Sequence, residues 1–197
     1  KGIERAPSAQ GLPKQKAAFL AQVARATGIF FSGGDQNRIT DVFSDVEILE
    51  ALRASHARGA TVGGTSAGAA VLSATMITGK KEELAIAAQS VDLSAGLGVL
   101  TGLIVDQHFL VRGRMGRLMS ALLATGVGVG LGIDEDTAAV VTDNRCIETI
   151  GERQVVIVKR GPRLRAFGLD VLAPGERYDL AEGVRLRTKP LDGPCSY

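Results

Sequence analysis

A serine flanked by glycines stands in the pentapeptide GTSAG at residues 64–68. The β-branched pair Thr61-Val62 precedes it, and small residues follow from Ala67 to Leu72. This order predicts a strand, a sharp turn and a helix, which is the context in which a GxSxG serine lies exposed above a sheet. The pattern therefore favours Ser66 as a nucleophile over the simpler interpretation of an ordinary glycine-rich turn.

A serine nucleophile needs a general base, and the base needs an acid that orients it. The chain has two histidines. His108 follows the apolar run 103–105 at the end of a predicted strand, whereas His56 lies near the end of a predicted helix and is interpreted as a solvent-facing residue. Glu135 follows the glycine-containing run 130–133, at another strand end. We therefore expect a triad of Ser66, His108 and Glu135.

Acyl transfer also needs two hydrogen-bond donors that point at one developing oxyanion. The backbone N–H of Ala67, at the start of the predicted helix, is one candidate, and that of Gly34, in a turn after the neighbouring strand, is the other. The alternative for the Gly33-Gly34 pair is a turn without function. The chain order serine, histidine, acid differs from that of the α/β-hydrolases, so that fold is not expected.

Hydrophobic periodicity predicts the elements that must position these residues. Helices are expected over residues 16–26, 39–58, 67–74 and 114–125. Strands are expected over residues 28–31, 61–62, 103–105 and 127–133, and strands of antiparallel type over 137–142, 147–150 and 154–158. Strands that alternate with helices predict an α/β fold with a mostly parallel sheet covered by helices on both faces. The polar clusters fall at strand ends, where such sheets bind ligands.

The composition of the chain further limits its expected domain number, partners and cofactors. The 197 residues suit one domain with a substantial core. The formal net charge is +2, without a block of Lys and Arg, so no nucleic-acid partner is expected. No apolar run reaches the roughly 18 residues that a membrane span needs, so no membrane partner is expected either. Cys146 and Cys195 match no metal-ligand spacing and are either two free thiols or one disulfide, so neither metal nor cofactor is expected.

Four separated segments resemble the cyanophycinases, in the serine-peptidase family that also contains aspartyl dipeptidase. They are GIFFSGGDQNRI at 28–39, GGTSAGAAV at 63–71, GLGVL and VDQHFLVRGRMGRL between 96 and 118, and GLGIDEDTAAVV at 130–141. The resemblance implies a class I glutamine amidotransferase-like α/β fold. It also implies that residues 1–197 form a single α/β serine peptidase domain without the earlier portion of the family fold, which is absent here or comes from another chain.

The resemblance implies roles as well. Ser66, His108 and Glu135 match the nucleophile, base and orienting acid. The positions that would line the substrate site are Gln36, Thr65, Asp106, Gln107, Arg112 and Arg114. The implied substrate is cyanophycin, a poly-aspartate that carries arginine on each β-carboxyl, and the implied product is the β-aspartyl-arginine dipeptide. A homodimer is also implied.

Three other interpretations remain open from the sequence. The chain could be an α- or isoaspartyl dipeptidase of the same family, or a catalytically silent homologue that binds acidic peptides. A nucleotide-binding α/β domain is disfavoured, because no GxGxxG opens a helix after the first strand and no P-loop lysine motif exists.

Overall fold

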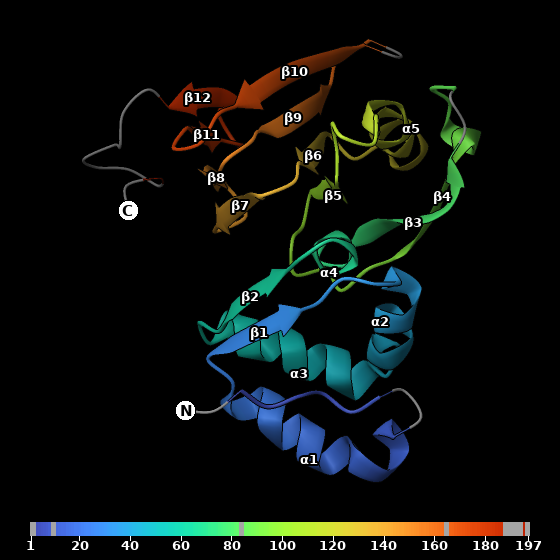
Figure 1. Cartoon of the computed structure of the whole chain (residues 1–197), viewed down its shortest axis with the longest axis vertical. Helices are drawn as coiled ribbons and strands as arrows, with labels where there is room; N and C mark the ends of the chain where they lie inside the picture. Colours follow the sequence, from blue (N-terminus) through green and yellow to red (C-terminus); the bar gives the residue numbers. More distant parts are fainter. Residues whose placement is uncertain (1–2, 9–10, 83–84, 164–165, 187–194, 196–197) are drawn as a thin grey trace.

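The computed structural model describes residues 3–8, 11–82, 85–163, 166–186 and Cys195, and it is a mixed α/β structure (Figure 1). Three helices surround a two-stranded parallel sheet at the N-terminal end. These elements are α1 (Leu12–Arg25), β1 (Gly28–Phe31), α2 (Gln36–Phe43), α3 (Val46–Ala57) and β2 (Thr61–Gly64). Their core holds Phe19, Phe31 and Phe43, whose rings meet edge to face at centroid distances of 6.3 and 5.3 Å.

The single helix predicted over residues 39–58 is two helices. The first ends at Phe43, and Asp45 caps the second, because its carboxylate accepts hydrogen bonds from the backbone N–H of Glu47 and Ile48. Helix α1 begins four residues before the predicted start, since Pro13 is well tolerated in a first helical turn.

A four-stranded sheet follows, in the order β10-β9-β6-β5. Its strands are β5 (Leu103–Gln107), β6 (Val129–Ile133), β9 (Val155–Arg160) and β10 (Phe167–Leu172). Strands β5 and β6 are parallel, and the other two pairs are antiparallel. Helix α5 (Met115–Thr125) packs on this sheet through Leu118 and Leu122, which are fully buried beside Ile104 and Val156.

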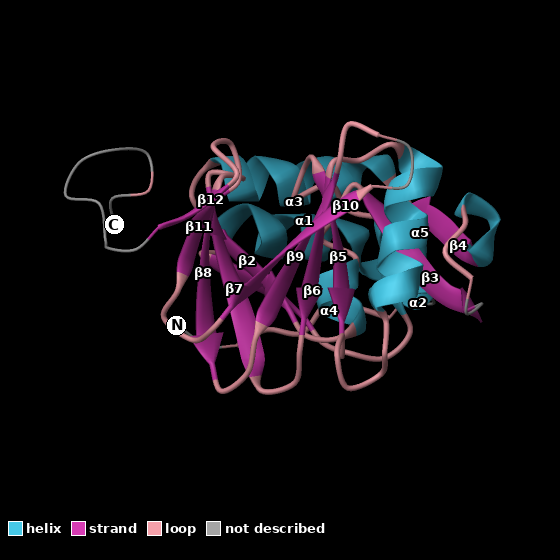
Figure 2. Cartoon of the chain, turned by 90° about the horizontal axis from the view of Figure 1, so that it is seen from above, coloured by secondary structure: helices cyan, strands magenta, loops and turns pink. Residues whose placement is uncertain are grey.

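A second four-stranded sheet lies beside the first, and Figure 2 shows their strands next to each other with helices behind. It contains β7 (Thr137–Thr142), β8 (Cys146–Gly151), β11 (Arg177–Asp179) and β12 (Val184–Leu186), all antiparallel. The antiparallel strands predicted over 137–142, 147–150 and 154–158 are confirmed as β7, β8 and β9, and β10, β11 and β12 are additions. A disulfide joins Cys146 to Cys195, which decides between the two states of the cysteines that the sequence left open.

Between the two ends of the molecule lie α4 (Ala67–Ala70) and a hairpin of β3 (Thr75–Glu82) and β4 (Val91–Ala95), joined through the short 3-10 helix η1 (Ala88–Ser90). The helix predicted over 67–74 thus ends after one turn. No element was predicted for the part of the chain that forms the hairpin, whose polar residues do not show a clear helical or strand period.

The prediction of a mostly parallel sheet is wrong. In the described part of the chain, parallel pairing is confined to β1–β2, β5–β6 and an isolated bridge between Ser73 and Leu100, and the remaining strand pairs are antiparallel. The strands expected to form one parallel sheet pair only as β1 with β2 and β5 with β6, in two separate sheets, and β9 joins the second of these sheets antiparallel to β6 and β10. No helix of the described residues is long and apolar enough to cross a membrane.

Candidate active site

Ser66 sits at the turn between β2 and α4 with φ 54° and ψ −120°, a conformation that non-glycine residues rarely adopt. The glycines around it allow close packing. A Cβ at Gly68 would collide with the carbonyl oxygen of Phe31, and a Cβ at Gly33 would lie 3.2 Å from the Cβ of Ser66. The turn after β1 and the start of α4 therefore enclose the serine from two sides, and its hydroxyl position is set by backbone contacts.

His108 follows β5 and also has a positive φ, of 49°. Its Nε2 lies 2.9 Å from Ser66 Oγ, and its Nδ1 lies 2.5 Å from Glu135 Oε1. The structure thus brings the predicted trio into one hydrogen-bonded chain from hydroxyl to imidazole to carboxylate. These distances are within the reach that a serine and its base require. His56 instead lies exposed in the last turn of α3, with its Nδ1 3.0 Å from the Ala60 carbonyl oxygen.

A pocket of ≈ 480 Å³ opens at Ser66 and His108. Besides these two it is lined by five of the predicted residues, which are Gly34, Gln36, Gln107, Arg112 and Arg114. It is also lined by Asp35, Asn37, Thr78, Gly79 and Arg117. Its walls come from three places: the turn after β1 with the start of α2, strand β3, and the segment between β5 and α5.

The two candidate oxyanion donors are backbone groups in different surroundings. Gly34 has φ +128° and lines the pocket, and nothing lies within 4 Å of the position that a Cβ would take. Ala67 is 1% exposed and begins α4 directly after the serine. Neither N–H donates a hydrogen bond within the described part of the chain. Both donors are therefore available to an acceptor brought by a substrate.

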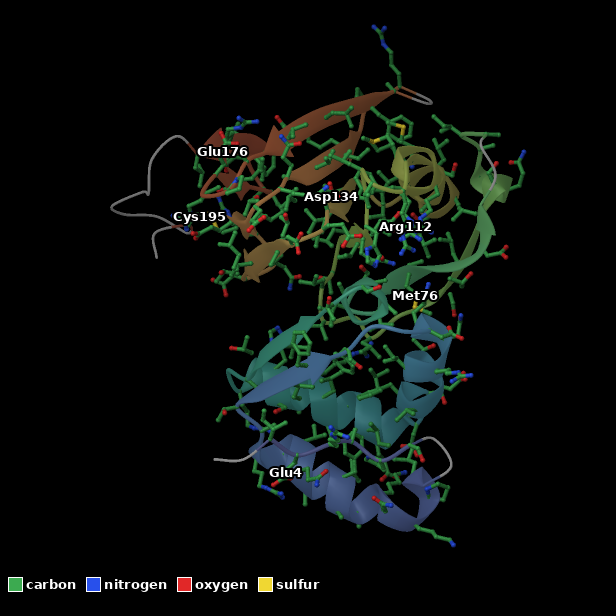
Figure 3. The ribbon with its side chains drawn as sticks, viewed as in Figure 1. Glu4, Met76, Arg112, Asp134, Glu176 and Cys195 are labelled. Carbon is green, nitrogen blue, oxygen red and sulfur yellow. A yellow bond between two sulfur atoms is a disulfide. The ribbon has the colours of Figure 1, made fainter. Side chains whose placement is uncertain are left out.

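The arginines near the pocket have different partners. Arg114 donates from one nitrogen to the backbone carbonyl and the Oε1 of Gln107, at 2.7 and 3.0 Å. Arg117 is 6% exposed and holds both carboxylate oxygens of Asp106 at 2.7 and 2.5 Å. Arg112 is exposed, and Figure 3 shows it in a group of nitrogen-bearing side chains between α5 and β3. The segment after β5 therefore gives the pocket a cationic wall.

The structure corrects the prediction for Asp106. The sequence placed it among the substrate-lining residues, but its side chain is 1% exposed and does not line the pocket. Besides the Arg117 pair, its Oδ1 accepts the backbone N–H of Gln107 at 2.8 Å. The carboxylate thus lies beneath the strand end that carries His108, where it fixes the backbone and does not face the substrate.

Comparisons with known proteins are consistent with this geometry. The model of peptidase family S51 matches residues 10–149. The chain belongs to peptidase family S51. It is 44% identical over 140 residues to a cyanophycinase from Synechococcus elongatus, covering 71% of this chain and 44% of that protein. It is also 44% identical over 137 residues to a cyanophycinase from Geminocystis herdmanii (strain PCC 6308), covering 69% of this chain and 50% of that protein.

The chain therefore spans about half the length of the curated relatives it matches. Among solved structures, it is similar to the crystal structure of a peptidase from an acI-B1 Actinobacterium, with a TM-score of 0.63 and 24% sequence identity. That match covers 83% of this chain and 64% of the other. At this identity the likeness supports the fold alone.

Within this S51 chain, the other predicted site residues fall into two groups. Gln36 lines the pocket, and its Nε2 donates to the carbonyl oxygens of Ile77 and Thr78 at 3.0 and 2.7 Å, which ties α2 to β3. Thr65 is exposed beside the serine but is not part of the pocket lining. Of the residues that sequence reasoning missed, Asp35 and Asn37 flank Gln36 and were detectable from that position.

Proposed function

We propose that this chain is the catalytic part of a serine exopeptidase that hydrolyses cyanophycin to β-aspartyl-arginine dipeptides. The observation that carries the proposal is the hydrogen-bonded chain from Ser66 to His108 to Glu135, which opens into a pocket with a wall of arginines. The similarity to cyanophycinases supports the choice of substrate.

In the acylation step, Ser66 Oγ attacks the carbonyl carbon of the scissile amide while His108 Nε2 takes the hydroxyl proton. The Glu135 carboxylate, in contact with Nδ1, orients the imidazole and stabilises the imidazolium that forms. The carbonyl oxygen becomes an oxyanion, which accepts hydrogen bonds from the backbone N–H groups of Gly34 and Ala67. His108 then gives its proton to the leaving amine, and an ester on Ser66 remains.

Deacylation repeats the same proton path with water as the nucleophile. His108 takes a proton from the water, whose oxygen attacks the ester carbon. The collapse of the second tetrahedral intermediate returns the proton to Ser66 Oγ and releases the dipeptide with a new carboxylate. Within the protein, only Ser66 and His108 change protonation state in these steps. Glu135 stays a carboxylate, and the two backbone N–H groups only donate hydrogen bonds.

Substrate binding is assigned to the cationic wall. We assign to Arg112 and Arg114 the free carboxylates of the substrate, which belong to its attached arginines and to its chain end, because a guanidinium pairs with a carboxylate through two parallel hydrogen bonds. Gln107 accepts from Arg114, and this contact orients the guanidinium at the pocket. Lysine cannot reproduce the planar fork, so Arg112→Lys and Arg114→Lys are expected to lose about tenfold or more in kcat/KM.

The deciding experiment measures product release from soluble cyanophycin beside a panel of α- and β-linked aspartyl dipeptides, with casein as an ordinary protein substrate. The proposal expects β-aspartyl-arginine from the polymer and little cleavage of casein. Preference for α-linked aspartyl dipeptides, with the polymer untouched, would replace the cyanophycinase assignment by the dipeptidase one. Labelling of Ser66 by a serine-directed covalent inhibitor separates both enzymes from a silent peptide-binding homologue, which would stay unlabelled.

Two finer features are part of the same proposal. The parallel β1–β2 pair and the serine turn that follows it support a class I glutamine amidotransferase-like arrangement around the nucleophile. The homodimer is proposed from the family resemblance alone. Light scattering of the purified chain, coupled to size-exclusion chromatography, tests it by giving the mass in solution.

A further inference from the structure

The charges that line the pocket are divided between two walls. The segment between β5 and α5 supplies Arg112, Arg114 and Arg117. The opposite contribution, from the turn after β1 and the first turn of α2, is Asp35 with the amides Gln36 and Asn37. Asp35 is the one carboxylate among the described residues of the pocket lining. The pocket therefore offers a substrate cations on one side and a single anion on the other.

The Asp35 carboxylate is held in place by the helix that it begins. Its Oδ1 accepts the backbone N–H of Asn37 at 2.9 Å and the Asn37 Nδ2 at 2.8 Å, so it caps α2. Gln36, the next residue, is anchored in turn to two carbonyls of β3. A carboxylate with a fixed backbone on both sides presents its charge to the pocket with little ordering cost when a cation arrives.

Asp35 also directly follows Gly34, one of the two backbone donors assigned to the oxyanion. A group that contacts Asp35 is consequently close to the scissile carbonyl. A cation there meets an opposite charge and gains an attraction that a neutral group lacks. A further carboxylate would be repelled, because like charges at short range cost free energy.

We infer that Asp35 is a specificity-determining residue that binds the guanidinium of the arginine carried by the aspartate at the scissile bond. This inference rests on the proposed function and deepens it: the pocket selects a substrate unit with carboxylates toward Arg112 and Arg114 and a cation toward Asp35. Cleavage of a poly-aspartate backbone without arginine is then disfavoured by the same residue that favours cyanophycin.

The test compares soluble cyanophycin with the same polymer after its arginines have been converted to citrulline, a neutral near-isostere. The variant is Asp35→Asn, because asparagine caps a helix as well as aspartate does and α2 is kept. The wild type should prefer the arginine polymer, and Asp35→Asn should lower kcat/KM on it by roughly 10- to 100-fold, mainly through KM. On the citrulline polymer the variant should match the wild type.

Two further variants make the result decisive. Asp35→Ser also keeps a capping side chain and removes the charge, so it should repeat the loss of preference if the charge is the cause. Asp41→Asn removes an exposed carboxylate of α2 that does not line the pocket, and it should leave both activities unchanged. If Asp35→Asn and Asp35→Ser keep the wild-type ratio of kcat/KM between the arginine and citrulline polymers, this inference is overturned while the proposed function stands. A wild type that cleaves neither polymer would overturn the proposed function, and this inference with it.

Discussion

Two arginine–aspartate pairs with nearly the same bonding lie in two different regions of the molecule. Asp106 and Arg117 pair beneath the pocket. Asp179 and Arg145 pair at the second four-stranded sheet, formed by β7, β8, β11 and β12 and called the C-terminal sheet below. There, Nε and Nη2 of Arg145 donate to the Asp179 carboxylate at 2.8–3.1 Å. The first carboxylate also holds the backbone N–H of Gln107, next to His108, whereas the second holds those of residues 181 and 182 after β11. One kind of contact thus fixes a reacting group in one region and a sheet end in the other.

Backbone conformation separates the two regions in the same way. In the catalytic region, positive φ occurs at Ser66 and His108, which make the proposed proton path. In the C-terminal sheet it occurs at Asp143 and Asn144, in the turn of a hairpin. Asp and Asn tolerate positive φ in turns for local reasons, and histidine is also enriched there among non-glycine residues, while serine rarely adopts it. The comparison teaches that a positive φ points to function most clearly at Ser66, whose residue type gives no local reason for it.

The largest effect is expected from substitutions in the catalytic region. Ser66→Ala and His108→Ala should each lower kcat on cyanophycin by about 10⁴- to 10⁶-fold, because either change removes the nucleophile or its base. His56→Ala is the matched control and should keep full activity. Steady-state kinetics with thermal unfolding of each variant checks the expectation, and equal losses at both histidines would contradict the assignment of the base.

Glu135→Gln should lower kcat by roughly 10⁴-fold, as an amide cannot stabilise the imidazolium and favours the wrong tautomer. The melting temperature should change little, since the side chain is 37% exposed. Activity within tenfold of the wild type would show that another acid orients His108.

Asp106→Asn should affect both stability and activity. It leaves the Arg117 guanidinium buried with a neutral partner, which is expected to lower the free energy of unfolding by about 3–5 kcal/mol. The folded fraction should also show reduced kcat/KM, because the backbone at Gln107 loses its acceptor. Denaturant unfolding and kinetics on the same preparation test this, and unchanged kcat/KM would remove the link between this pair and the site.

Loss of the disulfide should act on stability alone. Reduction, or the Cys195→Ser variant, is expected to lower the free energy of unfolding by about 2–4 kcal/mol, because the bond restricts the unfolded chain across 49 positions. None of the described residues that line the pocket lies in the C-terminal sheet, so kcat/KM should be kept at temperatures where the protein stays folded. A parallel loss of activity would mean that the two regions are coupled.

The smallest effect is expected at the second ion pair. The hydrogen bonds from Arg145 hold the pKa of the Asp179 carboxyl below its usual value. Its contribution is therefore complete above the unfolded pKa, about 4, and is lost as pH falls through the lower folded value. Asp179→Asn should cost about 1–3 kcal/mol at neutral pH.

The measurement is the free energy of unfolding of both proteins between pH 7 and pH 3. The difference between wild type and Asp179→Asn should shrink toward the acid end, while kcat/KM at neutral pH stays the same. A difference that does not depend on pH would show that the ionised carboxylate is not what stabilises the sheet.

The catalytic trio could be predicted from the sequence, because the position of each member depends mainly on neighbouring residues. Each of Ser66, His108 and Glu135 lies within four residues of the end of an apolar run, so its place near a strand end can be predicted from neighbouring residues. Asp106 was misjudged because its partner Arg117 lies a further 11 residues along, on α5, and the packing of that helix decides which way the carboxylate is buried. A short range of sequence does not contain that information.

In the fold, too, features set by neighbouring residues could be predicted and features set by distant residues could not. The break between α2 and α3 at residues 44 and 45 was not predicted, because the apolar stripe continues through both helices and therefore indicates one helix. The capping of α3 by Asp45 is the local interaction that favours two helices instead. Thr78 and Gly79 reach the pocket through the irregular pairing of β3 with β4, whose register shifts after Ile77. Register and curvature of a hairpin depend on contacts between distant strands, which a single sequence does not specify.

The disulfide has one more consequence, for the covalent topology of the chain. Cys146 belongs to the region that matches the S51 model, and Cys195 lies beyond it, so the bond closes most of the C-terminal sheet into a ring that includes β9 and β10. A protease that cuts one peptide bond between these two cysteines leaves a single molecule, heavier by one water. The two pieces part only after reduction and unfolding, so a nicked protein still keeps its C-terminal strands attached to the catalytic region.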